Sequence, residues 1–291
     1  MRCKFCKNRA IYSELRLCET HFNQFYEKKV KTYLEKYNIK NKKILIAVSG
    51  GKDSSSLAFV LNNLKEEFNL KLELFFLNHG IKGYSENCLN TVSLLSNTLN
   101  LKLNILDMKK VYGKTIDDFS ANKVCSVCGT VKRYLINKFA YENHFDFIAT
   151  GHNLDDELFF IFNNLFNQSL DYLMKLGPIT PTLKEYKLIG RIKPLYYLTE
   201  KENAIYAIIN KLPFYFGSCP YSKESRQFKL KMKINTLFEK REWKINFVKS
   251  INKLKRNHQK LFDGWKLCKK CGYPTTSEIC RFCKIMNQTS I

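Results

Sequence analysis

The chain has 291 residues, of which 45% are hydrophobic, and Lys and Arg outnumber Asp and Glu by 49 to 26. A chain of this size and composition can bury one sizeable core with small appendages, which excludes a disordered protein. The net charge of +23 favours a polyanionic partner such as nucleic acid over a lysine-rich solvated surface. Neither a long apolar run nor an apolar leader occurs, so we expect a cytoplasmic protein that is not inserted into membranes.

The first residues contain two paired metal-ligand motifs. Cys3-x2-Cys6 and Cys18-x2-His21 together offer three thiolates and one imidazole, a ligand set typical of tetrahedral zinc. The segment is too short to fold around an apolar core, so metal binding would supply its folding free energy. Cysteine turns without a metal are the alternative interpretation.

A glycine-rich turn follows the first apolar run of the chain. Residues 44–48 predict a buried strand, and the turn reads Ser49-Gly50-Gly51-Lys52-Asp53-Ser54-Ser55. Adjacent glycines allow the backbone to approach a polyphosphate, and the N-H groups of a following helix would point at the anion. The spacing fits neither the Walker A loop nor the dinucleotide fingerprint. The turn therefore predicts a nucleotide phosphate site of another kind, with a plain glycine turn as the alternative.

Apolar strands and amphipathic helices alternate along the middle of the chain. This alternation predicts an α/β fold with a doubly wound, Rossmann-like parallel sheet, whose sites lie beyond the carboxyl ends of the strands. The expected strands cover residues 44–48, 72–78, 101–107, 145–150 and 188–192. The expected helices cover residues 54–68, 84–99, 131–143, 154–166 and 199–212, with Pro213 after the last.

Polar residues follow two of these predicted strands. Asn78 and His79 follow the second strand, and a run from Gly151 to Glu157 that includes Asp155 and Asp156 follows the fourth. Carboxylates here, together with Asp53, would suit magnesium that bridges phosphates, and Gly151 would allow close approach of a nucleotide. The alternative is a helix N-terminus, capped by Asn153 and complemented by the acidic residues.

A third group of cysteines has no obvious fourth ligand. Cys125-x2-Cys128 and the distant Cys219 would provide three thiolates, and Lys132 and Arg133 follow Cys128 by one helical turn. If the cysteines converge, they could hold a 4Fe-4S cluster with one open iron, or act as a disulfide and persulfide relay. Zinc with a water ligand and three unrelated structural cysteines are the alternatives.

The C-terminal part is basic and ends in another cysteine motif. Residues 223–262 predict basic helices, and the four cysteines that follow have the spacing of a zinc ribbon. We therefore divide the chain into an N-terminal zinc finger (1–30), a catalytic domain (31–262) and a C-terminal zinc finger (263–291). Cys88 belongs to no group and is expected in the core. The terminal group consists of Cys268, Cys271, Cys280 and Cys283.

These motifs occur in the order of a known family. An N-terminal Cys/His knuckle precedes S-G-G-K-D-S at 49–54, C-S-V-C-G-x-x-K-R at 125–133, G-H-N-L-D-D-E at 151–157, R-I-K-P-L at 191–195, C-P-Y-S at 219–222 and the terminal knuckle. Over essentially the whole chain, this order resembles the tRNA 2-thiouridine synthetases of the TtuA type, within the TtcA/TtuA superfamily of N-type ATP pyrophosphatases. The cytidine-thiolating TtcA branch generally lacks both terminal modules, which favours the uridine branch.

The resemblance implies a reaction in two steps. ATP adenylates the C2 oxygen of a tRNA uridine, and sulfur then displaces AMP to leave 2-thiouridine. Cys125, Cys128 and Cys219 would ligate a 4Fe-4S cluster that carries the sulfide, Lys132 would assist catalysis, and Asp53 and Asp156 would lie near magnesium. The residues expected at ATP are Ala47, Val48, Ser49, Gly50, Gly51, Lys52, Asp53, Ser54, Ser55, Asn78, His79, Gly151 and Asp156.

The resemblance also implies partners. We expect a homodimer that takes sulfur from a ubiquitin-like protein ending in a thiocarboxylate, or from free sulfide. Uridine 54 of the T loop is the favoured target, because of C-P-Y-S and the two terminal knuckles, and uridine 34 of the anticodon is the alternative. The chain departs from the family at Asn78, where an acidic residue is frequent, and at residues 168–172, which lack the usual arginine.

Two other classes of protein share some of these features. A small-molecule ATP pyrophosphatase, such as an amidotransferase or NAD synthetase, would use the phosphate loop but needs neither the three cysteines nor the positive charge. A zinc-knuckle RNA-binding protein without catalysis would leave Ser49 to Ser54 and Asp156 without a role. Only an adenylating tRNA sulfurtransferase uses the loop, the grouped cysteines and the charge together.

Overall fold

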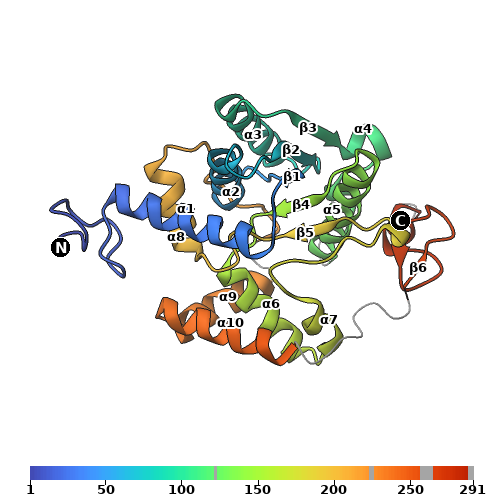
Figure 1. Ribbon diagram of the computed structural model, residues 1–291. Helices are drawn as coiled ribbons and strands as arrows, with labels where there is room; N and C mark the ends of the chain where they lie inside the picture. The colour runs from blue at the N-terminus through green and yellow to red at the C-terminus, as the bar shows by residue number, and fades with distance from the viewer. Residues whose placement is uncertain (121–122, 223–225, 256–264, 288–291) are drawn as a thin grey trace.

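The computed structural model describes residues 1–120, 123–222, 226–255 and 265–287 (Figure 1). Five strands form the central sheet: β1 (Lys43–Ala47), β2 (Lys71–Asn78), β3 (Leu103–Asp107), β4 (Phe147–Thr150) and β5 (Gly190–Ile192). The helices around it are α1 (Glu19–Lys36), α2 (Lys52–Leu64), α3 (Ser85–Leu99), α4 (Met108–Tyr112), α5 (Val124–Glu142), α6 (Leu154–Phe166), α7 (Leu170–Lys175), α8 (Glu200–Ile209), α9 (Arg226–Leu237) and α10 (Arg241–Lys255). The C-terminal module adds β6 (Lys266–Leu267), β7 (Pro274–Thr275) and α11 (Arg281–Met286).

The sheet has the strand order β3-β2-β1-β4-β5, and all of its pairs are parallel. This confirms the predicted doubly wound α/β fold. The chain leaves β1 in one direction to build β2 and β3 and returns to the other side for β4 and β5. Because the strand order reverses beside β1, the loops after β1 and β4 separate there and leave a crevice at their carboxyl ends.

Side chains of the central strands alternate between two apolar layers. Ile44 and Ile46 of β1 join a cluster built with α1, α2, α3 and α8, whereas Leu45 joins one built with α5 and the C-terminal module. The alternation follows from the pleat of a strand, in which successive side chains point to opposite faces. Both faces of β1 are thus covered, which explains its continuous apolar run.

Helix α5 begins earlier than the sequence predicts. The expected start lay at Val131, but the helix starts at Val124 and includes Cys125 and Cys128. Val124, Val127 and Val131 are all buried on one side of it, so the apolar helical spacing continues through the cysteine motif. The two cysteines therefore lie on the first turns of a helix and not in a loop before one.

The basic segment is helical where it is described. α9 and α10 bury Ile234 and Val248 against α6, which confirms basic helices over residues 226–255. Residues 256–262, and with them the predicted domain boundary, lie outside the described residues. α1 runs through residue 30, where the other boundary is predicted, and the division into domains stays a prediction. Within the described ranges, no helix combines the length and apolarity needed to cross a bilayer.

A buried ion pair links three distant parts of the chain. Glu202 on α8 is fully buried and accepts a hydrogen bond from Arg241 Nε of α10 at 2.6 Å and one from Tyr12 of the N-terminal module at 3.2 Å. Its other oxygen accepts from the backbone N-H of Thr199 at 2.7 Å. A buried carboxylate needs such partners, since desolvation otherwise costs several kcal/mol.

We expect Arg241→Met to lower the free energy of unfolding by about 3–5 kcal/mol, because it leaves the Glu202 carboxylate buried without its cation. Urea unfolding followed by circular dichroism measures this. The exposed pair Lys269–Glu278 provides the control, since its atoms lie 2.9 Å apart in solvent and Lys269→Met should cost at most about 1 kcal/mol. Equal losses of unfolding free energy in the two variants would contradict the stabilising role of the buried pair Glu202–Arg241.

Candidate functional site

The turn after β1 passes close to helix α3 at Gly50. Gly50 has a φ of +82°, and a Cβ there would lie 3.0 Å from the Cα of Cys88. Cys88 itself is buried in the core, as predicted. A side chain at position 50 would therefore be strained and would collide with α3. The chain passes from strand through glycine turn to helix as the sequence predicts, and α2 starts at Lys52.

Hydrogen bonds define which groups of the loop face outward. Ser54 accepts from the backbone N-H of Ser49 at 3.2 Å and donates to the carbonyl of Gly51 at 2.9 Å. Ser55 is fully buried and donates its hydroxyl to the carbonyl of Pro213 at 2.8 Å, so this hydroxyl anchors α2 and is not directed at a ligand. The first N-H groups of α2 have no partner in the helix and form an anion-binding end.

The Asp53 carboxylate lies at the centre of the crevice. It accepts hydrogen bonds from Asn203 at 2.7 Å and Asn153 at 3.2 Å, and Lys52 Nζ lies 3.1 Å from its other oxygen. Burial raises the pKa of Asp53, although Lys52 opposes this. Sequence reasoning missed Asn203, because nothing local distinguishes it on an amphipathic helix.

Two lysines and two further carboxylates extend this group. Lys52 Nζ lies 2.8 Å from Glu200, and Lys231 Nζ of α9 lies 2.7 Å from Asp156 and 3.2 Å from Glu200. Burial raises the pKa of Glu200, but the two ammonium groups outweigh it and lower this pKa to about 2. Glu200 and Lys231 were also missed, since their motifs indicate only a helix start and a basic helix.

The acidic run after β4 starts α6 as well as facing the crevice. Asn153 caps the helix by accepting from the N-H groups of Asp155 and Asp156, as the alternative interpretation held. Asp155 is buried and accepts from Lys244 Nζ and from the N-H of Glu200, so both of its carboxylate oxygens already have partners within the protein. A Cβ on Gly151 would lie 3.1 Å from the backbone of Asp53, so its small size serves helix packing first.

Asn78 and His79 stand at the end of β2. The Asn78 amide donates to Asp107 at 2.9 Å and accepts from the N-H of Gly80, so it braces the strand end. Nε2 of His79 is buried with no hydrogen-bond partner among the described residues. Burial and the nearby Lys132 ammonium hold the pKa of His79 well below its usual value. The Lys132 ammonium therefore lies near His79.

Cys125, Cys128 and Cys219 gather beside the crevice. Cys125 Sγ lies 3.6 Å from the carbonyl of Tyr221, two residues beyond Cys219. Burial raises the pKa of the Cys219 thiol, the Cys128 thiol raises it further, and Lys132 lowers it. Unlike the two terminal groups, these three cysteines do not have all of their sulfur atoms within 4.8 Å of one another. In a four-iron cluster each cysteine binds a different iron, so three cysteines would leave one iron open.

Each terminal module brings four ligand atoms within 4.8 Å of one another. In the first, the Nδ1 atom of His21 lies 3.2 Å from Cys18 Sγ and 3.5 Å from Cys3 Sγ. Burial opposes ionisation of Cys3, but backbone N-H groups lower its pKa to about 6. Both groups could bind a metal ion: Cys3, Cys6, Cys18 and His21, and Cys268, Cys271, Cys280 and Cys283.

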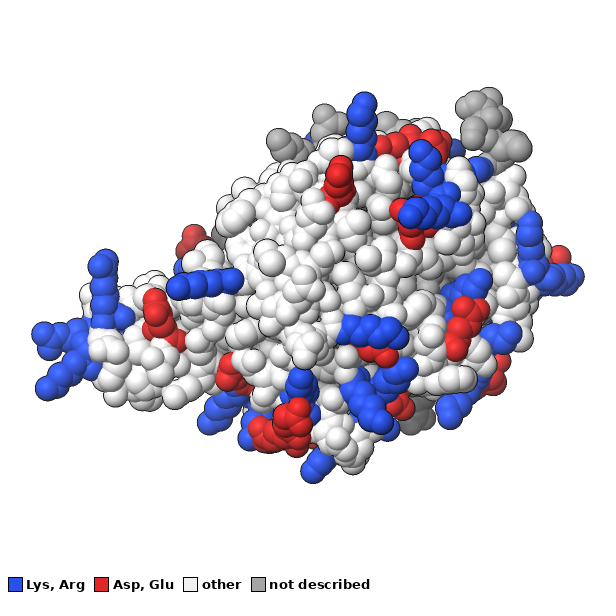
Figure 2. Space-filling model, turned by 90° about the horizontal axis from the view of Figure 1, so that it is seen from above, with Lys and Arg blue, Asp and Glu red and all other residues white. Residues whose placement is uncertain are grey.

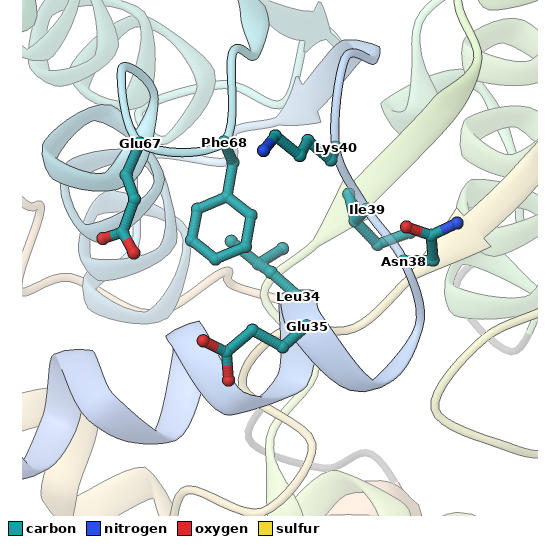
Figure 3. Close-up of a pocket in the computed structure, with 7 residues that line it drawn as sticks. All are labelled: Leu34, Glu35, Asn38, Ile39, Lys40, Glu67 and Phe68. Carbon is teal, nitrogen blue, oxygen red and sulfur yellow. The ribbon is translucent and has the colours of Figure 1, made fainter.

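A separate pocket of about 340 Å³ lies away from this crevice (Figure 3). It is formed by the end of α1 and the turn after α2, which precede the amino ends of β1 and β2. The glycine-rich turn after β1 lies at the carboxyl ends of the strands, so the pocket is not part of this site. Its lining residues are Leu34, Glu35, Asn38, Ile39, Lys40, Glu67 and Phe68.

Charged side chains are spread over the surface. Figure 2 shows Lys and Arg interspersed with Asp and Glu around the rim of one face, whose centre is largely uncharged. On this face, the described residues form no continuous basic surface, and blue side chains extend onto the projecting N-terminal module. The positive excess of the chain is therefore not concentrated here.

Comparison with known proteins identifies the family. Residues 18–227 match the PP-loop domain family. A tRNA-5-methyluridine(54) 2-sulfurtransferase of Pyrococcus horikoshii is 40% identical and covers 98% of this chain and 93% of its own, and one of Thermotoga maritima is 36% identical over 99% and 97%. The U34-tRNA thiolase NcsA from Methanococcus maripaludis, solved with its [4Fe-4S] cluster, superposes with a TM-score of 0.82 at 27% identity over 97% and 95%. The chain therefore belongs to the PP-loop family and, within it, to the tRNA 2-sulfurtransferases.

Proposed function

We propose that this protein replaces the C2 oxygen of uridine 54 in tRNA by sulfur. The observation that supports this most directly is the gathering of the phosphate loop and Lys132 with Cys125, Cys128 and Cys219 at one edge of the sheet. The two most similar relatives reported above are both named for position 54. Position 34 is the second candidate, because NcsA is named for it and shares the fold.

The first step activates the base. The first turn of α2 and Lys52 would bind the ATP phosphates, and the uridine C2 oxygen attacks the α-phosphorus while pyrophosphate leaves. Asp53 and Asp156 would hold magnesium, whose charge offsets that of the phosphates. Lys52 and Lys231 now neutralise the carboxylates Asp53, Asp156 and Glu200, so the polyphosphate must compete with Glu200 for both ammonium groups.

The second step replaces AMP by sulfur. Sulfur attacks C2, and the C2–O bond breaks so that oxygen leaves with AMP. Cys125, Cys128 and Cys219 would hold a 4Fe-4S cluster, which supplies an open iron for sulfide. Lys132 lies beside His79 and Cys219 and would stabilise negative charge that develops between the two reactants. The donor would be a ubiquitin-like thiocarboxylate protein or free sulfide.

The terminal modules would each hold one zinc ion and help to bind tRNA. They flank the sheet domain on opposite sides, and the C-terminal one stacks Phe282 on Tyr134 of α5 at 3.7 Å between ring centroids (Figure 1). We place the active protein in the cytoplasm as a homodimer. Free thiols and relatives named cytoplasmic tRNA 2-thiolation protein 1 support that compartment.

Asp53→Asn is expected to lower the rate of 2-thiouridine formation by at least about 100-fold, because it removes charge from the proposed magnesium site while keeping the hydrogen-bonding shape. Mass spectrometry of nucleosides from tRNA treated with the purified variant measures the yield. A variant that keeps the full rate would contradict the role of Asp53, whereas a wild-type protein that binds tRNA and forms no 2-thiouridine would be a binding-only RNA protein.

Cys219→Ser is expected to abolish thiolation and to lower the iron content, while the dissociation constant of ATP stays within about twofold. Thr98→Ala serves as the control and should keep iron and activity, because the exposed Thr98 hydroxyl only donates to the carbonyl of Leu94 within α3. Iron analysis, calorimetry with ATP and nucleoside mass spectrometry provide the three readouts. An unchanged 2-thiouridine yield from Cys219→Ser would refute the role of this thiol.

Cys271→Ser is expected to remove about half of the bound zinc, because it deletes one of four ligands from one of two modules. Elemental analysis of the purified protein measures the loss. Cys6→Ser should remove the other half independently. A zinc content that neither substitution changes would contradict both assignments.

A further inference from the structure

Three arginines gather around the first half of α5. Arg133 belongs to α5, Arg191 to β5 and Arg281 to α11 of the C-terminal module. Nη2 of Arg191 donates to the backbone carbonyl of Arg133 at 3.3 Å, and Nη2 of Arg281 donates to Ser126 Oγ at 2.5 Å. Throughout the described ranges, none of the three pairs with an Asp or Glu side chain within 4.0 Å.

This arrangement is electrostatically unfavourable without an anion. Burial and the neighbouring Arg133 together lower the pKa of Arg191 to about 10. Burial and the neighbouring Arg281 also lower the pKa of Arg133. Arg191 is half-buried and Arg133 is exposed, so a ligand can reach both side chains from solvent. Proteins keep like charges together in this way chiefly at functional sites.

The space around Arg133 is shaped for its guanidinium. A Cβ on Gly129 would lie 3.3 Å from Nη1 of Arg133, so the guanidinium lies against the backbone of the preceding helical turn. Cys128 is close enough that its charge raises the pKa of Arg133. An anion bound by Arg133 would therefore lie next to the cysteine group.

A neutral histidine borders the same area. Nδ1 of His152 lies 2.8 Å from Thr150 Oγ1, and its ring packs on Phe160. Burial lowers the pKa of His152 to about 3, and Lys193, Arg191, Lys231 and Arg133 all act in the same direction. The imidazole is therefore uncharged, and it does not compensate the positive charge of the arginines.

We propose that Arg133, Arg191 and Arg281 bind a backbone phosphate of the substrate RNA, beside the nucleotide that is modified. This inference rests on the proposed function. Guanidinium groups bind phosphate through paired hydrogen bonds, and arginines from three elements can surround one phosphate. The C-terminal module contributes Arg281, which gives that module a direct part in positioning the substrate.

The alternative source of phosphate is ATP. Its phosphates already have donors at the first turn of α2 and at Lys52, whereas the arginines lie toward β5 and the C-terminal module. Tyr172 of α7, whose side chain is 68% exposed, is close enough to raise the pKa of Arg133. An exposed aromatic ring beside a phosphate site suits stacking of an RNA base. RNA is therefore the favoured ligand.

The test compares Arg133→Gln and Arg191→Gln with Lys71→Gln. Lys71 is exposed at the amino end of β2, on the opposite edge of the sheet, and controls for the loss of one charge. We expect each arginine variant to raise the dissociation constant of unmodified tRNA at least about fivefold. The slope of the logarithm of tRNA affinity against the logarithm of salt concentration should fall in magnitude by about 1. The control should bind tRNA like the wild-type protein. The dissociation constant of ATP should stay within about twofold.

Thermal unfolding separates binding from a structural role. Because the arginines repel one another, each variant should melt at the wild-type temperature or above it, whereas loss of a structural residue would lower that temperature. Unchanged tRNA affinity, weakened ATP binding, or lower melting of both variants would each overturn the inference. A wild-type protein that binds tRNA but does not thiolate it would instead contradict the proposed function alone.

Discussion

The contact between Gly151 and the first turn of α2 brings the two halves of the sheet together. Any side chain at this position would meet the backbone of Asp53 at 3.1 Å, so only glycine lets the segment after β4 lie against the phosphate loop. That approach allows Asn153, which starts α6, to donate to Asp53. The loop, the acidic run and α8 then form one crevice at the point where the strand order reverses.

The carboxylates within this crevice are paired with ammonium groups before any ligand binds. Asp53, Asp156 and Glu200 share the ammonium groups of Lys52 and Lys231, which keeps three half-buried or exposed carboxylates from repelling one another. Lys231 comes from α9, so the basic C-terminal helices contribute to the site as well as to the net charge. A magnesium-bound polyphosphate suits this arrangement, because it carries both a cation for the carboxylates and anions for the lysines.

Near α5, by contrast, positive side chains gather without carboxylate partners. The cysteine group is bordered by Lys132, Arg133, Arg191 and Arg281, and no carboxylate within the described ranges pairs with any of them. Paired charges in the crevice and unpaired positive charges around α5 thus both lie near the cysteines, where a nucleotide triphosphate and an RNA strand would meet. The C-terminal module, which packs Phe282 on Tyr134, brings Arg281 to this boundary. This position would let a small appendage with a group of metal-ligand residues take part in the proposed site.

The linear order of residues was enough to predict the α/β fold, the strand–glycine–helix turn and both terminal metal groups, because apolar periodicity and close cysteine spacing are local properties. It did not reveal Asn203, Glu200 or Lys231, whose importance depends on where α8 and α9 pack. It also misplaced the start of α5, because the apolar helical spacing continues through the cysteine motif. Motifs of neighbouring residues can be recognised in the sequence. The tertiary structure alone decides which charged side chains face one another, because these come from helices that are distant in the chain and pack around the same sheet.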